Sequence, residues 1–179
     1  LRVGRVDVQR LQQDGATFEV RPAFGTTLRT GVLHPYAQIV GELLAFKALG
    51  SRFGLAARVR AGTQTPVAEP HLEFWLGGLD TIRGYRDNFV RTQTYALANV
   101  EARAIAFDTD LLACQLALFA VASVSLRQAG GRIGTLSVGP GIRFFIPKLV
   151  DSELRIDLAL PLVNAPSQWD WAIGTEPFF

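Results

Sequence analysis

The residues in this chain that could do chemistry are an arginine in a glycine-rich segment and a carboxylate on the strand that follows. Arg83 lies in residues 77–85, Gly-Gly-Leu-Asp-Thr-Ile-Arg-Gly-Tyr, where glycines permit a backbone with positive φ. Glu101 lies in residues 99–103, where small or apolar residues alternate with polar ones. A guanidinium that is partly removed from water needs a carboxylate to accept its forked donors. The sequence therefore predicts an ion pair between Arg83 and Glu101.

The other reactive residues do not form a pattern that supports catalysis or a metal site. His34 and His71 are far apart and near predicted loops, and the sequence contains no Gly-x-Ser-x-Gly motif. The single cysteine, Cys114, excludes an internal disulfide and gives little support to thiol or metal chemistry. We therefore expect a protein that is not an enzyme and that uses no cofactor and no metal.

The composition favours contact with lipid over contact with nucleic acid. Of the 179 residues, 49% are hydrophobic and only 19% are charged, which is little charge for a soluble domain. The net charge is +2 and the basic residues are scattered, so no nucleic-acid partner is expected. The longest apolar stretch, 111–124, contains Gln115 and Ser123, and no run approaches the roughly 18 residues of a transmembrane helix. If the chain meets a membrane, it does so through strands.

Most segments between turn signals alternate with a period of two, which indicates β-strands. Near the C-terminus, for example, Leu154, Ile156 and Leu158 alternate with Arg155 and Asp157. The same pattern predicts strands near 16–28, 34–47, 52–62, 92–107, 111–126, 133–146, 152–162 and 168–178, with a less certain one near 2–12.

The lengths of these strands and of their connections are typical of a membrane barrel. The strands run to about 11 to 16 residues, whereas strands of soluble proteins average about 5 or 6 and a tilted membrane-spanning strand needs about 9 to 11. Tight turns are predicted at 13–15, 49–51 and 108–110, whereas 63–91 is far longer. We therefore predict an all-β fold, a transmembrane antiparallel β-barrel of 8 or more strands with an inward-folded loop. A large soluble β-domain is the alternative, but several arginines would then face its common interior.

The predicted barrel domain covers residues 15–179, with the internal loop at 63–91. Residues 1–14 form either an additional strand or a linker. Because closed single-chain bacterial barrels normally have an even number of strands, a ninth strand near 2–12 leaves two alternatives. Either that segment does not span the membrane, or the chain is the C-terminal part of a larger barrel.

The motif at residues 82–85 carries a resemblance to a known superfamily. Ile82-Arg83-Gly84-Tyr85, preceded by Gly77-Gly78 and followed by Asn99-Val100-Glu101-Ala102-Arg103, resembles the Val-Arg-Gly-Phe/Tyr loop tip of outer-membrane assembly factors and two-partner secretion transporters, the BamA and TamA type. The resemblance covers roughly residues 15 to 179, and segments 139–144 and 154–162 are similar to later strands of that superfamily. The terminal Phe179 resembles its assembly signal.

One position departs from the pattern of the superfamily. Its members usually supply a second acidic partner for the loop arginine on the next strand, within a pattern like Phe-x-Asp-x-Gly. Here Val121 replaces that acid. Asp157 and Glu42 are the two candidate carboxylates for that role, and the sequence does not choose between them.

The resemblance implies a location in a bacterial-type outer membrane and a role in the assembly or transport of outer-membrane proteins. The implied partners are outer-membrane lipid and other envelope proteins or barrel clients, with a homo-oligomer possible. The alternative is a small structural barrel that anchors a multi-protein envelope complex and has no insertase activity. Periplasmic domains encoded upstream of Leu1 would favour the first hypothesis, and a signal peptide alone would favour the second.

Overall fold

The computed structural model describes residues 1–9, 11–65, 72–126, 131–146, 153–165 and 168–175. Within these ranges the chain folds into one large antiparallel sheet of nine strands and a small sheet of two. The predicted all-β class is confirmed. In this part of the chain, no helix is long and apolar enough to cross a membrane.

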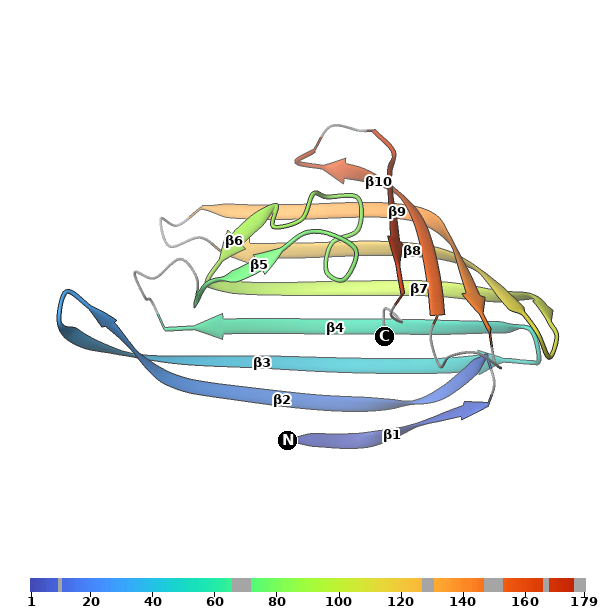
Figure 1. The fold of residues 1–179 in the computed structure, drawn as a ribbon, viewed down its shortest axis with the longest axis horizontal. Coiled ribbons are helices and arrows are strands. Elements are labelled where there is room, and N and C mark those ends of the chain that lie inside the picture. Colours follow the sequence, from blue (N-terminus) through green and yellow to red (C-terminus); the bar gives the residue numbers. More distant parts are fainter. Residues whose placement is uncertain (10, 66–71, 127–130, 147–152, 166–167, 176–179) are drawn as a thin grey trace.

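The large sheet follows the order of the chain, apart from the hairpin of the small sheet (Figure 1). Its strands are β1 (Arg2–Gln9), β2 (Gln12–Arg29), β3 (Val32–Leu49), β4 (Phe53–Gln64), β7 (Thr94–Asp108), β8 (Ala113–Leu126), β9 (Arg132–Phe145), β10 (Glu153–Val163) and β11 (Asp170–Gly174). The small sheet pairs β5 (Phe74–Leu76) with β6 (Val90–Thr92). Over the described residues β1 and β11 are the two edges of the large sheet, so closure into a barrel is not seen.

Several strands are much longer than those of ordinary soluble domains. β2 and β3 have 18 residues each, which at about 3.3 Å per residue makes them about 60 Å long. In Figure 1, β2, β3, β4 and β7 run along the length of the molecule, whereas β10 and β11 cross that direction steeply. The β5–β6 hairpin and its loop lie over β7, β8 and β9 in the same view.

The two faces of the large sheet differ in the kind of side chain that they carry. We call the face against which the β5–β6 loop packs the inner face, and the opposite one the outer face. On β7, Asn99 and Glu101 are buried on the inner face, whereas Val100 between them is 53% exposed. On β4, Arg58 is buried and Val59 is exposed. The sheet therefore buries polar side chains and exposes apolar ones, the reverse of a water-soluble domain.

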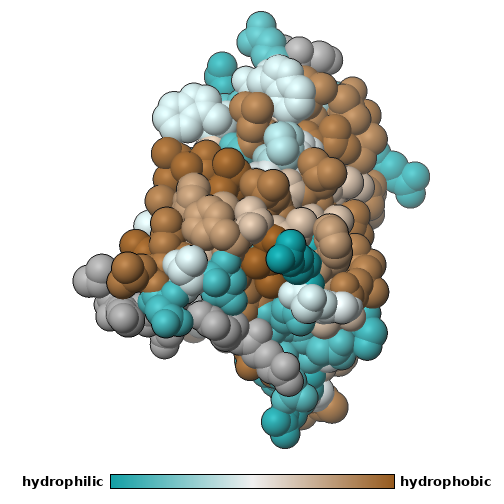
Figure 2. Space-filling model, turned by 90° about the vertical axis from the view of Figure 1, so that its right-hand side faces the viewer, coloured by the Kyte–Doolittle hydropathy of each residue, from teal (hydrophilic) through white to brown (hydrophobic). Residues whose placement is uncertain are grey.

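The outer surface is correspondingly apolar over a wide area. Exposed large apolar side chains occur on strands from β1 to β11; examples are Val3, Phe18, Leu43, Leu55, Val59, Val100, Leu118, Ile142, Leu158, Trp171 and Ile173. Figure 2, which views one end of the molecule along its long axis, shows hydrophobic residues in brown across the middle of that end, with hydrophilic ones mostly below and some at the top.

The apolar core lies between the β5–β6 hairpin and the inner face. The hairpin and its loop contribute Leu76, Ile82, Tyr85 and Val90, and the sheet contributes Tyr95, Leu97, Phe119, Val121 and Ala159. This cluster is the reason that the loop segment is ordered against the sheet, because burying these side chains removes a large apolar area from water.

Two details of the chain path differ from the prediction. The turn expected at 13–15 is wrong, because Gly15 pairs with Val6 inside the β1–β2 ladder and the strand begins at Gln12. Asp14 lies opposite Asp7 in that ladder, and its carboxylate accepts a hydrogen bond from Lys47 Nζ on β3 at 3.0 Å. Likewise, the segment 63–91 contains the two strands of the hairpin and is not one irregular loop.

The remaining boundaries agree more closely. Gly50 turns the chain between β3 and β4 with a φ of 74°, within the predicted turn at 49–51. The strand expected near 2–12 exists as β1, which pairs with β2 along its whole length. The last strand, expected at 168–178, is described only over Asp170–Gly174. Phe179 lies outside the described residues.

Candidate functional site

The loop between β5 and β6 is folded tightly on itself before it meets the sheet. The Thr81 hydroxyl donates to the Gly77 carbonyl at 2.8 Å and accepts from the Gly77 N–H at 2.7 Å. The Gly78 N–H donates to the Tyr85 carbonyl at 2.9 Å. Gly77 and Gly78 have φ of 134° and 84°, a region that only glycine adopts readily. These bonds hold residues 82–85 as a preformed tip.

Gly84 brings the tip of the loop into contact with β10. Its φ is 80°, and a Cβ built at this position would lie 2.9 Å from the Cβ of Ala159 and 3.4 Å from Cδ of Pro161. Any larger residue would therefore push the loop away from the strand. Ile82, which precedes the arginine, is fully buried in the apolar cluster.

Arg83 enters a closed ring of charges on the inner face. Its Nη2 donates to Oε2 of Glu101 on β7 at 2.9 Å, and its Nε lies 3.3 Å from Oδ2 of Asp157 on β10. Arg143 on β9 contacts the same two carboxylates, with Nη2 at 3.2 Å from Glu101 and Nη1 at 2.5 Å from Asp157. We call these four residues the charge ring. None is more than 2% exposed, so each charge depends on its partners for compensation.

Further contacts hold the charge ring and the loop in place. The Cζ of Arg83 lies 4.2 Å from the centroid of the Phe119 ring, a distance at which a cation–π attraction operates. Arg155 on β10 donates from Nη2 to Oδ1 of Asp80 at 2.9 Å, and Arg58 on β4 donates from Nη1 to the Asp80 carbonyl at 3.1 Å. The loop is therefore bound to β4 on one side of β7–β9 and to β10 on the other.

The protonation state of the loop arginine is fixed by two opposing effects. Burial lowers the pKa of Arg83 to about 10, and the negative charges of Glu101 and Asp157 act in the opposite direction. Arg83 therefore remains protonated at neutral pH. Arg103 and Arg155 also contact the carboxylates of Glu101 and Asp157, so four guanidinium groups share two carboxylates at this site.

Tyr85 has a separate role at an irregularity of the sheet. The ladder between β9 and β10 shifts register between Pro161 and Val163. The Tyr85 hydroxyl accepts a hydrogen bond from the Leu136 N–H at 3.1 Å. It also lies within hydrogen-bond distance of two carbonyl oxygens to which it can donate, those of Leu136 and Val163. The loop tip therefore contacts the backbone of both strands at the register shift, where Val163 is paired with Leu136.

The structure brings together most of the residues that the sequence singles out. Arg83 and Glu101 lie at the hydrogen-bond distance that the sequence predicts. Of the two candidates for a second carboxylate, Asp157 contacts Arg83, whereas Glu42 hydrogen-bonds with Arg58 and Arg21. Val121, at the position of the missing acid, is buried in the apolar cluster.

Sequence reasoning missed Arg143 and the hydroxyl contacts of Tyr85. The sequence did indicate that Arg143 faces the interior, because Arg143 lies on the polar side of an alternating strand, as Arg155 and Asp157 do. Which of these polar side chains meet depends on strand register, in which Gly141 is opposite Asp157 and Arg143 is opposite Arg155. That register cannot be read from a single strand.

The charge ring and its neighbours are suited to holding the loop against the sheet. Among the described residues, no three His, Cys, Asp or Glu side chains are grouped as a metal site requires. Comparison with protein-family models and with curated proteins finds no match to this chain. The site must therefore be interpreted from its own geometry.

Removing either member of the Arg83–Glu101 pair should loosen the loop. Arg83→Ala and Glu101→Ala should each lower the free energy of unfolding by about 3 to 5 kcal/mol, because each leaves buried partners without their counter-charge. The double variant should cost less than the sum of the two. Urea-induced unfolding, with proteolysis of loop 77–89 as a second probe, measures both effects.

Arg91→Ala is the matched control, since Arg91 lies in the same hairpin and forms a half-exposed ion pair with Glu73. It should change the free energy of unfolding by less than about 1 kcal/mol. Strict additivity of the two charge-ring variants, or an effect of Arg91→Ala as large as theirs, would contradict the role given to the charge ring.

Proposed function

We propose that this chain is a membrane-spanning β-barrel domain of a bacterial-type outer membrane, related to outer-membrane protein insertases and translocators. The observation that carries the proposal is the reversed sidedness of the large sheet. Leu43, Val59 and Val100 are exposed on the outer face, whereas Arg58, Asn99 and Glu101 are buried on the inner face. In water such an outer face would be an aggregation-prone patch, but in lipid it is the expected surface.

The dimensions of the strands support the same proposal. β4, β7, β8, β9 and β10 have between 11 and 15 residues, which meets the roughly 9 to 11 residues that a tilted spanning strand needs. β2 and β3 are longer and would extend beyond the hydrocarbon region. The proposal requires that the edges at β1 and β11 be covered, because open sheet edges are not tolerated in lipid.

The resemblance at residues 82–85 connects the barrel to protein assembly or transport. Within this proposal, loop 77–89 folds into the barrel and the charge ring braces the wall from β7 to β10. The partners are outer-membrane lipid and barrel clients or other envelope proteins, and a homo-oligomer is possible. A brace of this kind would allow the remaining strands to move while the loop side stays fixed.

One observation favours the alternative, a structural barrel that anchors an envelope complex. The loop, the apolar cluster and the charge ring fill the space against β7–β10 with buried side chains. A barrel whose interior is filled in this way serves as an anchor without any transport step. The two functions share the membrane location and differ in activity toward clients.

A pair of neighbouring substitutions tests the membrane location. Leu43 and Leu44 are adjacent on β3, with Leu43 exposed on the outer face and Leu44 half-buried on the inner face. In lipid vesicles, Leu43→Arg should lower the free energy of unfolding by about 2 to 4 kcal/mol if it lies near the bilayer midplane. Leu44→Arg should cost less, because its side chain faces the polar interior. A soluble domain predicts the opposite order, so that order would overturn the proposal.

An assembly activity predicts that the protein acts on other barrels. Vesicles containing this chain should fold an added, urea-denatured small outer-membrane barrel several-fold faster than empty vesicles, with Arg83→Ala reducing the effect. Gel-shift of the heat-modifiable client measures the rate. Equal rates in both vesicle preparations would contradict the insertase function and leave the anchor function in its place.

A further inference from the structure

Leu11, Gln12 and Gln13, which we call the β1–β2 turn, lie against the inner face, at the end of the strands opposite to the one where the β5–β6 hairpin connects β4 to β7. Gln115 on β8 donates from Nε2 to the Leu11 carbonyl at 2.6 Å, although three strands separate β2 from β8 in the sheet. Gln12 donates from Nε2 to the Gly50 carbonyl at 2.7 Å. The sheet is therefore curled so strongly that the turn reaches across it.

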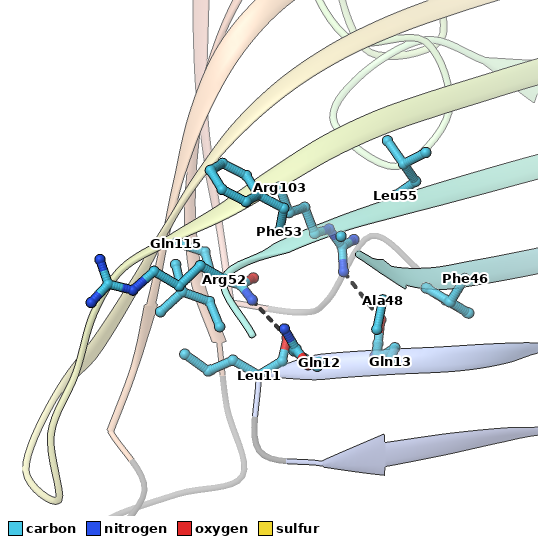
Figure 3. A pocket seen from close by; sticks show the side chains of 12 residues that line it. Leu11, Gln12, Gln13, Phe46, Ala48, Arg52, Phe53, Leu55, Arg103 and Gln115 are labelled. Carbon is cyan, nitrogen blue, oxygen red and sulfur yellow. Dashed lines mark hydrogen bonds between the residues drawn. The ribbon is translucent and has the colours of Figure 1, made fainter. Parts of the chain in front are cut away.

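A third contact ties the turn to β7. Arg103 donates from Nη1 to Oε1 of Gln13 at 3.1 Å, as Figure 3 shows from close by. The cavity between these residues, which Phe46, Phe53 and Ile105 also line, has a volume of only about 20 Å³. That is close to the space of a single water molecule.

Arg103 contacts the charge ring at the same time. Its Nε donates to Oε1 of Glu101 at 2.9 Å, while the other oxygen of Glu101 accepts from Arg83 and Arg143. A continuous series of polar contacts thus runs from Gln13 through Arg103 and Glu101 to Arg83. Its two ends are the β1–β2 turn and loop 77–89, whose hairpin connects β4 to β7 at the opposite end of these strands.

We propose that Arg103 is a positioning residue that couples closure of this end by the β1–β2 turn to the seating of loop 77–89. Gln13 fixes one arm of the planar guanidinium, which orients the Nε–H toward Glu101. Without Gln13 the long side chain regains rotamer freedom, and Glu101 is held less firmly against Arg83. Because coupling between two sites is reciprocal, unseating the loop also loosens the turn. The inference goes beyond the membrane proposal and does not depend on it.

Two adjacent glutamines give a matched experiment. Gln13→Ala removes the contact with Arg103, whereas Gln12→Ala removes an anchor of the same turn that contacts Gly50 instead. The measurement is amide hydrogen exchange at Gly78 and Tyr85, whose N–H groups bond within the loop, on protein folded in lipid or detergent. Gln13→Ala should speed exchange at both by about fivefold, a typical coupling, and Gln12→Ala, which leaves the Gln13–Arg103 contact in place, should speed it much less.

The reciprocal variant and a conservative one complete the test. Arg83→Ala should speed exchange of the amides of residues 11–13, which do not contact Arg83. Arg103→Lys keeps the charge but replaces the fork with a single ammonium group, and it should reproduce the effect of Gln13→Ala on the loop. Equal loop exchange in the Gln12→Ala and Gln13→Ala proteins, or no change at 11–13 in Arg83→Ala, would overturn the coupling even if the protein inserts into membranes.

Discussion

Glu101 and Asp157 accept contacts from Arg83 and Arg143 on the inner face of the sheet, where none of the four side chains is more than 2% exposed. An isolated charge in such a place would cost several kcal/mol, so each member of the charge ring is tolerated only because the others are present. The carboxylates come from β7 and β10 and the arginines from the loop and β9. The ring therefore fixes the loop and the spacing of three strands, β7, β9 and β10, together.

The polar interior constrains the other face of the sheet. In a strand, successive side chains point to opposite faces, so a strand that places Arg155 and Asp157 inside must place Leu154, Ile156 and Leu158 outside. The same reciprocity holds on β7, where Val100 lies between Asn99 and Glu101. An apolar outer surface follows from the alternation once the charges face inward. A lipid environment is the proposal that makes both faces favourable at once.

Each of the four residues of the loop motif 82–85 makes its own contact with the sheet. Ile82 fills the apolar cluster, Arg83 completes the charge ring, Gly84 permits contact with Ala159, and Tyr85 serves the register shift between β9 and β10. These four roles involve different strands and different kinds of interaction. A single substitution in the motif would therefore loosen the loop by removing one kind of contact, and which strand is affected depends on the residue that is changed.

Local patterns in the sequence predicted the strands well, because alternation with a period of two is a local property. The pairing of Arg83 with Glu101 was also predictable, since a buried guanidinium requires an acid and Glu101 lies on a polar strand face. The choice of Asp157 over Glu42 was not predictable, because it depends on how far the sheet curls between β3 and β10. The Asp14-Gly15 pair was misleading because both residues are paired inside the β1–β2 ladder, opposite Asp7 and Val6, and that register is not a local property of the pair.

The central claim, that the outer face contacts lipid while the inner face is sealed by the loop, is tested most directly at Val100. A nitroxide attached to Val100→Cys, with Cys114→Ser to remove the native thiol, reports its surroundings in vesicles by electron paramagnetic resonance. The account predicts strong relaxation by oxygen, which concentrates in the bilayer, and little by a water-soluble nickel chelate. Strong relaxation by the nickel chelate and weak relaxation by oxygen would contradict it.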